Sequence, residues 1–496
     1  MQPDYSGSIL KAVGLTWEVS SYVDGRWLPF DGSRVDHVED PATATVVAEV
    51  LSGGADEVDQ AARAAHRAYR EEWSKTTATQ RGVLLAALGA RLQEESEPFA
   101  RLESLDTGKP LSQARGDVML AARYFSFYAA AADQLSGDTI EAARADLSYT
   151  VREPFGVVAQ IIPWNSPISQ LARGVAAALA AGNTVVLKPS ELAPLSSLAF
   201  AELSTRAGLP AGVLNVVAGT GTSAGQPLAR HPLVRQITFT GSVESGRRVL
   251  EASATHIVPC TLELGGKSPA LVFEDADLTA AAAAAVGAIR RNSGQSCSAL
   301  TRFLVHERVH DELLGRILSS VSKLRIGPGL LDLDLGPLVS AVQLERVQSL
   351  VSGVRDEGAA VACGGSRPAG SGLSAGHFFA PTVLTGVSNS MTAARQEIFG
   401  PVQSLITFTD EDEAVSLAND SDYGLCAAIF TRDFARAHRL TPQLEAGQVH
   451  INEYPLDSVE TPFGGFKASG IGREKGLQAL EGYTQLKTIL ARVEAE

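Results

Sequence analysis

Cys297 lies in the segment GQSCSA (294–299), where its neighbours are glycine, glutamine and serine. A structural cysteine usually packs among apolar side chains as a small hydrophobic residue. A nucleophilic thiolate instead needs partial exposure, hydrogen-bond donors and close approach of the backbone, which glycine permits. No histidine is near in the sequence to activate the thiol, so its base must come from elsewhere. On this segment alone, a catalytic and a structural role are equally supported.

Glu263 is the candidate base. It precedes two glycines in TLELGGKSPA (261–270), where one predicted unit of the chain ends and the next begins. A crossing between units is a favoured place for an active-site cleft, and burial there raises a carboxyl pKa into the range of a general base. A carboxylate exposed to solvent at a strand end is the alternative.

Polar side chains also follow two predicted strands. Asn165, in QIIPWNSP (160–167), is either a helix cap or an amide donor aimed at an oxyanion. Lys188 and Glu191, in LKPSE (187–191), are either solvated charges or contacts to a ribose at the carboxyl end of a sheet. An acid in that place repels a 2′-phosphate, so it favours NAD over NADP.

Two glycine-rich turns, AGTGTSAG (218–225) and FTGSVESG (239–246), follow strands but lack the spacing GxGxxG. Their expected task is to let the backbone approach a phosphate at a helix N-terminus. HERVH (306–310) matches the zinc motif HExxH in letters, but that motif needs both histidines on one helical face. TRFLVHE reads as a strand, so His306 closes a strand and His310 opens a helix. We predict no metal site.

The elements that must position these residues follow from the hydrophobic pattern. Residues 55–135 show helical spacing, and from about 150 strands alternate with helices. A second alternating run extends from about 268 to 465. Such alternation predicts parallel sheets covered on both faces, in two successive α/β units. The polar segment 137–154 resembles a hairpin that interrupts the first unit.

Composition limits the classes of function. The 496 residues carry a net charge of −14, and the pI of about 5.2 argues against a nucleic-acid-binding surface. The alanine-rich apolar stretches are too short or too polar to span a membrane, and no secretory signal is evident. Four cysteines without CxxC spacing favour a reducing compartment. We therefore expect a cytoplasmic protein of two or more domains, without a nucleic-acid or membrane partner.

The order of the motifs carries more information than any single motif. The motifs that carry a family resemblance are, in order, PWN, KPSE, FTGS, LELGGK, GQSC, EIFGPV (397–402) and PFGGFKASGIGRE (462–474). Through them the chain resembles the NAD(P)-dependent aldehyde dehydrogenase superfamily over essentially its whole length. The resemblance implies an α/β fold with a modified Rossmann cofactor domain (1–136 and 155–262) and an α/β catalytic domain (263–465). It also implies a small oligomerisation segment (137–154 and 478–496), and dimers or tetramers of the chain.

The resemblance assigns roles residue by residue. It makes Cys297 the nucleophile toward an aldehyde, Asn165 and the Cys297 N–H the oxyanion donors, and Glu263 the base that activates water for thioester hydrolysis. The implied cofactor is NAD. The residues expected to bind it are Ile161, Trp164, Lys188, Glu191, Gly221, Gly241, Ser242, Glu397 and Phe399. Many relatives have a lysine after the position of Arg173 for a proton relay with the glutamate matching Glu474, whereas this chain has Gly174.

The expected substrate pocket is polar. Gln170, Arg173 and Arg291 stand where broad aliphatic relatives carry aromatic residues, and the two arginines are similar to those of succinic semialdehyde dehydrogenases. A guanidinium suits a distal carboxylate. Alternatively each arginine pairs with an internal acid, and Asp457 is a candidate. The pattern favours a polar or carboxylate-bearing semialdehyde, such as succinic semialdehyde.

Other functions remain open at this point. Aromatic or general aliphatic aldehydes are alternative substrates. A CoA-acylating enzyme is less favoured, because such relatives lack the water-activating glutamate that Glu263 matches. A structural or binding protein is expected to have lost the nucleophile, the base or the oxyanion donor, and all three are present.

Overall fold

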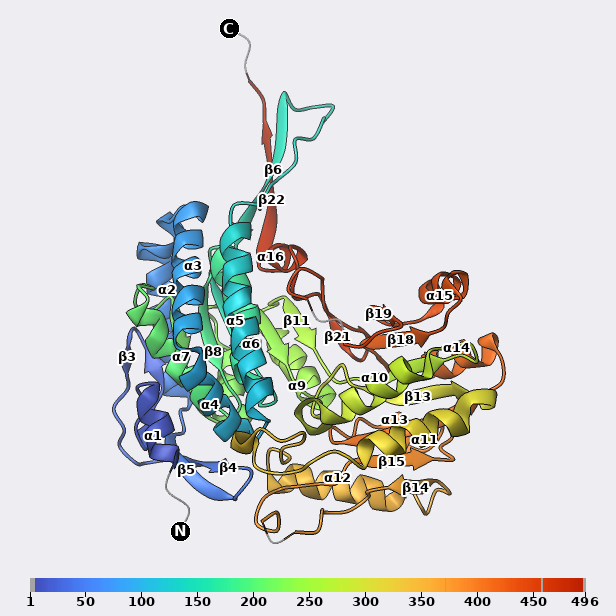
Figure 1. Ribbon diagram of the computed structural model, residues 1–496. Coiled ribbons are helices and arrows are strands. Elements are labelled where there is room, and N and C mark those ends of the chain that lie inside the picture. Colours follow the sequence, from blue (N-terminus) through green and yellow to red (C-terminus); the bar gives the residue numbers. More distant parts are fainter. Residues whose placement is uncertain (1–4, 371, 456–457, 494–496) are drawn as a thin grey trace.

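The computed structural model describes residues 5–370, 372–455 and 458–493. Two large sheets lie next to each other, helices cover both, and a two-stranded arm projects from the body (Figure 1). The α/β fold expected from the alternating pattern is therefore confirmed. Among the described residues, no helix has the length and apolarity required to cross a membrane.

The first sheet has the strand order β21-β11-β10-β7-β8-β9-β2-β3, with a parallel centre from β11 to β9. Its strands are β2 (Tyr22–Val23), β3 (Arg26–Trp27), β7 (Val157–Ile161), β8 (Thr184–Lys188), β9 (Leu214–Val216), β10 (Val234–Thr240), β11 (Cys260–Glu263) and β21 (Gly470–Ile471). Because side chains alternate between the faces of a strand, Val158 packs into one hydrophobic cluster, while Val157 and Ala159 pack into another. Both faces are thus buried, as a parallel sheet requires.

The second sheet has the order β14-β15-β16-β13-β12-β18-β19, parallel except at β14. Its strands are β12 (Ser268–Val272), β13 (Leu300–His306), β14 (Ala360–Cys363), β15 (Thr382–Thr385), β16 (Val402–Phe408), β18 (Cys426–Phe430) and β19 (Gln448–Ile451). Leu271 and Ala270 again point into different clusters. Smaller sheets are formed by β1 (Glu18–Val19), β4 (Val35–Asp40) and β5 (Thr45–Leu51), and by β17 (Tyr423–Gly424) and β20 (Phe466–Lys467).

Helices cover the two sheets on both faces. They are α1 (Tyr5–Ala12), α2 (Ala55–Glu71), α3 (Ala78–Glu94), α4 (Ser96–Thr107), α5 (Leu111–Ala131), α6 (Pro167–Ala180), α7 (Leu195–Arg206), α8 (Gln226–Ala229), α9 (Val243–Ser253), α10 (Leu278–Arg290), α11 (His310–Val321), α12 (Ala341–Gly353), α13 (Thr392–Arg395), α14 (Glu411–Asn419), α15 (Phe434–Leu440) and α16 (Gln478–Gly482). Local chemistry sets their ends: Pro167 opens α6, and the Asp277 carboxylate caps α10 by accepting from Thr279 and Ala280 N–H.

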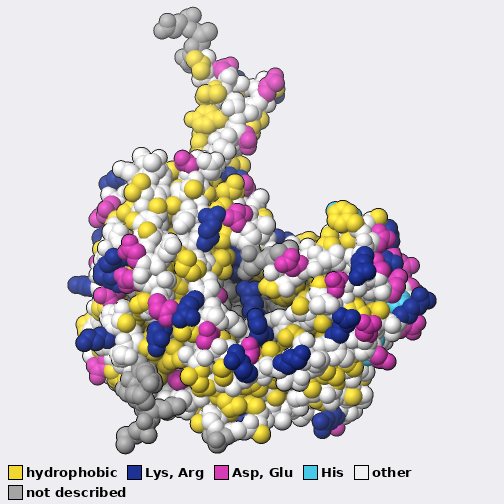
Figure 2. Space-filling view, viewed as in Figure 1, with side chains coloured by type: hydrophobic (Ala, Val, Ile, Leu, Met, Phe, Trp, Pro, Cys, Tyr) yellow, Lys and Arg dark blue, Asp and Glu magenta, His cyan; other side chains and the backbone are white. Residues whose placement is uncertain are grey.

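The arm pairs two segments that are far apart in the sequence. Strand β6 (Leu147–Pro154) runs antiparallel to β22 (Thr484–Ala491) over its full length. The expected hairpin within 137–154 is present only as a short return, in which the Ile140 N–H donates to the Ser148 carbonyl. The main partner of β6 is therefore the C-terminal strand. Apolar side chains gather along this arm in Figure 2.

Candidate active site

A cavity follows the carboxyl ends of the central strands β7, β8 and β10. One part, of about 320 Å³, and an adjoining part, of about 420 Å³, share Trp164, Gly241 and Ser242 among their lining residues. The residues that the sequence assigned to a cofactor all line these two parts. They are Ile161, Trp164, Lys188, Glu191, Gly221, Gly241, Ser242, Glu397 and Phe399. This is the edge of a parallel sheet at which ligands bind in open α/β folds.

The first part suits a charged nucleotide. Ser242 caps α9, because its hydroxyl accepts from the Ser245 N–H at 3.2 Å, and the N-terminus of a helix attracts anions. At the end of β8, the buried Lys188 ammonium donates to the Glu191 carboxylate at 3.1 Å. Burial lowers the pKa of Lys188, and Glu191 opposes that shift. The pairing orients a carboxylate at the position from which it can accept hydrogen bonds from ribose hydroxyls.

The second part ends at Glu397 and Phe399. The Glu397 carboxylate accepts from the Gly266 N–H at 3.1 Å, and burial raises its pKa to about 7. Phe399 has a left-handed backbone (φ 57°), and its ring meets Trp164 edge-on with the ring centroids 5.3 Å apart. Such backbone strain is concentrated at functional sites. The residues present therefore fit a dinucleotide: Lys188, Glu191 and Ser242 would hold its charged part, and Glu397 and Phe399 line the part of the cavity that Cys297 also lines.

A strained turn presents Cys297 to this cavity. Asn292, Ser293 and Gly294 have φ values of 47°, 53° and 72°, so three successive residues are left-handed directly after α10. A Cβ on Gly294 would collide with the Gly400 carbonyl oxygen, so only glycine fits. The turn sends the chain back toward the sheet edge, where Cys297 lines the cavity.

The Cys297 thiol is partly buried and packs against Leu425, Cys426 and Phe463. Burial raises the pKa of the thiol to about 11, and the nearby Arg173 guanidinium counteracts part of this rise. The thiol is thus protonated at neutral pH in the free protein. A nucleophilic role requires a proton acceptor close by.

Asn165 stands between β7 and α6, on the wall of the same cavity. One hydrogen of its side-chain amide is donated to the Gln295 carbonyl at 3.0 Å, and the Asn292 amide donates to the Asn165 carbonyl at 2.8 Å. These two bonds tie the PWN turn to the cysteine turn. The Asn165 side chain is thereby held at the wall of the cavity that Cys297 also lines.

Glu263 is the last residue of β11 and is 1 % exposed. Neither carboxylate oxygen has a hydrogen-bond partner, and the side chain lines the same cavity as Cys297. Burial raises the pKa of Glu263 well above its usual range, the Glu474 charge adds to this rise, and Arg173 opposes it. A buried carboxyl of this kind is suited to take and hold a proton.

Comparisons with known proteins agree with this arrangement. The model of the aldehyde dehydrogenase family matches residues 27–489. The chain belongs to the aldehyde dehydrogenase family. It is 41 % identical to the "Putative aldehyde dehydrogenase DhaS" of Bacillus subtilis over 476 residues, 95 % of each chain. The crystal structure of a "Putative Aldehyde Dehydrogenase from Burkholderia cenocepacia" is similar with a TM-score of 0.93 and 46 % identity, covering 96 % of this chain and 100 % of that one.

A betaine aldehyde dehydrogenase from Staphylococcus aureus, solved in complex with NAD+, superposes with a TM-score of 0.96 at 36 % identity. The match covers 99 % of this chain and 98 % of the betaine aldehyde dehydrogenase chain. The family, the fold class and the expectation of an NAD-dependent aldehyde dehydrogenase are therefore confirmed. The roles of individual residues, the domain boundaries and the substrate remain predictions.

Arg173 lines the cavity in which it was expected, but its guanidinium is engaged with an internal acid. Its guanidinium pairs with Glu474 inside this aldehyde dehydrogenase, and it also donates to the Thr240 hydroxyl at 3.1 Å. Both members of the pair are almost fully buried. The pairing of an arginine with an internal acid, which the sequence left open, is thus observed, but the acid is Glu474. Gly174 leaves no room for a lysine, because the Gln160 amide occupies the space of its Cβ.

A second cavity, the substrate cavity, is also lined by Cys297. It contains the expected substrate residues Gln170, Arg173 and Arg291. Lys475 and Phe463 are among the lining residues that the sequence did not assign to this cavity. The Lys475 ammonium lies 4.9 Å and the Arg173 guanidinium 5.5 Å from the Phe463 ring centroid. The signal for Lys475 was its place directly after the PFGGFKASGIGRE motif; the left-handed backbone that aims it inward (φ 61°) cannot be seen in the sequence. Asp457, the remaining candidate, lies outside the described residues.

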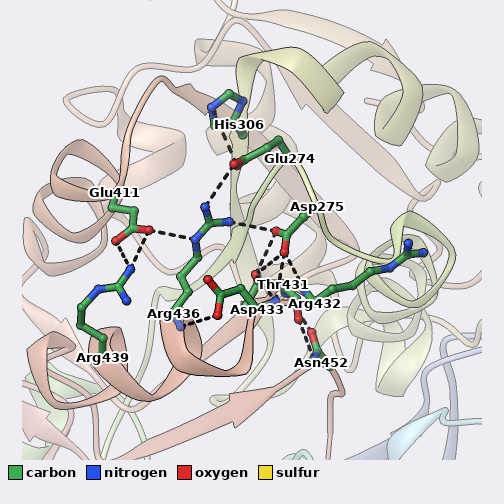
Figure 3. Close-up of polar contacts among 10 residues, drawn as sticks. All are labelled: Glu274, Asp275, His306, Glu411, Thr431, Arg432, Asp433, Arg436, Arg439 and Asn452. Atoms are coloured by element: carbon green, nitrogen blue, oxygen red, sulfur yellow. Dashed lines mark hydrogen bonds and ion pairs between the residues drawn. The ribbon is translucent and has the colours of Figure 1, made fainter.

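The two histidines of the HERVH segment lie in the elements predicted for them. His306 ends β13, and His310 opens α11. Figure 3 shows the His306 ring directed at Glu274, which belongs to an ion cluster around Arg436. Arg436 also pairs with Asp275 and Glu411 and thereby ties α15 and α14 to the end of β12. Within the described ranges, no group of three or more His, Cys, Asp and Glu side chains is placed to hold a metal ion.

Proposed function

We propose that the chain oxidises a polar, carboxylate-bearing aldehyde to the carboxylic acid with NAD, through a thioester on Cys297. One observation carries the proposal: Cys297, Asn165 and Glu263, from three separate segments, line one cavity that adjoins the nucleotide cavity. The three side chains supply a nucleophile, an oxyanion donor and a base around one point, as acyl-transfer chemistry requires.

The chain's own residues perform the steps in order. The Cys297 sulfur bonds to the aldehyde carbon, and the thiol proton passes to a nearby base. The Asn165 amide and the Cys297 N–H hold the negative oxygen of the resulting thiohemiacetal. The residues of the nucleotide cavity would hold NAD, which would supply the acceptor for the hydride lost from this carbon. Glu263 then takes a proton from a water molecule, whose oxygen displaces the sulfur and releases the acid. The loss of one oxyanion donor costs about 2.7–4 kcal/mol in the barrier.

The polarity of the second cavity supports an anionic substrate. Arg291 and Lys475 line it, and Asp117, the one carboxylate among its described lining residues, is paired with Lys109. A quaternary ammonium group such as that of betaine aldehyde is best held over aromatic faces. Here the Phe463 ring already carries two internal cations, Arg173 and Lys475. We therefore favour a semialdehyde such as succinic semialdehyde. Aromatic and aliphatic aldehydes are the alternatives.

A substrate panel tests this choice. NADH formation is measured with semialdehydes, alkanals, benzaldehydes and betaine aldehyde on the wild type, on Arg291→Ala and on Arg290→Ala. Arg290 is the matched control, because it is the exposed neighbour outside the cavity. We expect Arg291→Ala to lower kcat/KM about tenfold or more for semialdehydes alone, as lost charge-assisted bonds do. An equal effect on every class of aldehyde contradicts the carboxylate proposal.

Water, rather than CoA, is the proposed acceptor of the acyl group. Glu263 supports this, since its two oxygens are unpaired and lie on the cavity wall next to Cys297. Addition of CoA is expected to leave the rate unchanged. An increase in rate, with an acyl-CoA product, would favour the CoA-acylating alternative.

We also propose that the chain forms a homodimer or homotetramer through its arm. Leu486 and Leu490 of β22 are 56 % and 66 % exposed, and an isolated two-stranded ribbon is only marginally stable in water. A cytoplasmic location remains a prediction, and the four free cysteines support it.

A further inference from the structure

We propose that Lys109 is a positioning residue of the oxyanion pocket: it holds Ser166, and through Ser166 the neighbouring Asn165 amide, in the place where the amide meets the oxyanion. The inference rests on the proposed function, in which Asn165 stabilises the thiohemiacetal. Lys109 lies in the turn between α4 and α5 and belongs to none of the motifs that indicated the site.

Lys109 is a buried cation directed at the site. It is 1 % exposed, and its ammonium donates to the Ser166 hydroxyl at 3.2 Å. The same ammonium pairs with Asp117 and with Glu103, the latter at 3.4 Å. Ser166 and Asp117 line the substrate cavity beside Cys297. One buried side chain thus connects a strongly held charge cluster with the residue next to the oxyanion donor.

The charges around Lys109 prevent its movement. Glu103 and Asp117 pair with this one ammonium, and Glu103 is fully buried, as is the nearby Asp106, on whose pKa the Lys109 charge acts. Burial raises the pKa of Glu103 and of Asp106, and Lys109 opposes both shifts. A buried ammonium with carboxyl partners cannot leave them without a large desolvation cost. Its third contact, to Ser166, is therefore fixed as well.

The backbone of the same turn supports the cysteine side of the pocket. Gly336 and Gly329 pack so closely on the Gly108 and Lys109 carbonyls that neither position has room for a Cβ. The loop carrying Gly336 accepts from the Ser293 hydroxyl at 2.7 Å, two residues from Gln295, whose carbonyl holds the Asn165 amide. The turn at Lys109 thus contacts Ser166 directly, and it is linked to the turn that leads to Cys297 through the loop of Gly336.

A stabilising role alone predicts a different result from a positioning role. If Lys109 only stabilises the fold, its loss lowers the melting temperature and has the same effect on kcat whether or not Asn165 is present. If Lys109 acts through the Asn165 amide, its loss lowers kcat only while that amide exists. Residues that act through a common group are not additive, and a double-mutant cycle measures this coupling.

The test is a cycle of Lys109→Met, Asn165→Ala and the double variant, with Ser166→Ala as a milder break in the same chain of contacts. We expect Lys109→Met to lower kcat about 10- to 30-fold with the KM for NAD within about twofold, since small misplacements of a catalytic group have effects of this size. In the Asn165→Ala background, the same change is expected to lower kcat less than about twofold.

The control is Arg81→Met, which removes two hydrogen bonds to backbone carbonyls, those of Ala180 and Thr76, away from the site. It is expected to lower the melting temperature but not kcat. The role of Lys109 would be overturned if Lys109→Met lowered kcat equally in both backgrounds, or if Ser166→Ala left kcat unchanged. If Lys109→Met does not fold, the kcat of Ser166→Ala decides. A wild type that forms no NADH with any aldehyde contradicts the proposed function instead.

Discussion

At the residue scale, one guanidinium acts on two buried carboxyls. Glu263 and Glu474 are both almost fully buried; Arg173 pairs with Glu474, and its charge also lowers the pKa of the unpaired Glu263. Arginine keeps its charge at any accessible pH, so it cannot pass a proton on as a lysine can. We infer that Arg173 sets the charge of this pair, and that protons leave Glu263 through water.

Removal of this cation provides a test. We expect Arg173→Met to destabilise the fold by about 3–5 kcal/mol, because it leaves a buried charge unpaired. The Glu263 pKa is expected to rise further, so the pH dependence of kcat shifts to higher pH for every aldehyde alike. Unfolding in denaturant and pH profiles with two classes of aldehyde measure both effects. A loss confined to semialdehydes would show instead that Arg173 binds the substrate carboxylate.

Glu263 also gives a prediction on stability and pH. Its folded-state pKa is raised, so the folded state binds more protons than the unfolded state at intermediate pH, and this contribution to stability is lost as the pH rises. In Glu263→Gln the side chain cannot ionise, so the folded state no longer loses stability through ionisation of this buried group at high pH. Its melting temperature should exceed that of the wild type by roughly 1–2 °C at pH 8 and match it near pH 5. The reverse order, measured by calorimetry at both pH values, contradicts the assignment.

At the element scale, sequence and structure agree where the information is local. Short apolar runs bounded by turn residues predicted β7, β8 and β10, and therefore the place of the motif residues at their carboxyl ends. The pairing of Arg173 with Glu474 was missed because it depends on the packing of α6, which Gln160 and Gly174 decide. The local pattern predicted a hairpin within 137–154, whereas the main partner of β6 is β22; only the family resemblance grouped 137–154 with 478–496, because long-range strand pairing leaves no local signal.

The cysteine turn is an element whose geometry can be tested. Gly294→Ala places a methyl group against the Gly400 carbonyl at a left-handed φ of 72°. We expect a loss of about 1–3 kcal/mol in stability and a lower kcat. Gly287→Ala in α10 is the control, since its Cβ meets open space, and it should stabilise by about 0.4–1 kcal/mol. Unfolding in denaturant measures the stability of the two variants, and NADH formation measures their kcat. Equal stability and equal kcat in the two variants would contradict the strained turn.

At the scale of the whole molecule, the arm is the feature that a single chain leaves incomplete. Figure 1 shows it extending away from the two sheets, with β22 at its edge. Its apolar side chains gain stability only when another surface covers them. Because no residue of β6 or β22 is among the described lining residues of the cavities around Cys297, assembly and chemistry are separable by mutation.

Charges on the arm should disrupt assembly. Leu486→Glu combined with Leu490→Glu is expected to lower the molar mass measured by light scattering to that of a smaller assembly or a monomer. Val342→Glu, at an apolar residue 77 % exposed on α12, is the control and should leave the mass unchanged. A mass unaffected by the arm variant would place the interface elsewhere.

The most direct test of the central claim is the mass of the covalent intermediate. Glu263→Gln should still form the thioester but hydrolyse it slowly, so that incubation with NAD and an aldehyde oxidised by the wild type yields one NADH per chain and an acyl group on Cys297. Intact-mass and peptide mass spectrometry locate this group, and Cys297→Ser should show neither. Sustained turnover of Glu263→Gln at the wild-type rate, or one NADH per chain without any mass added at Cys297, would contradict the account.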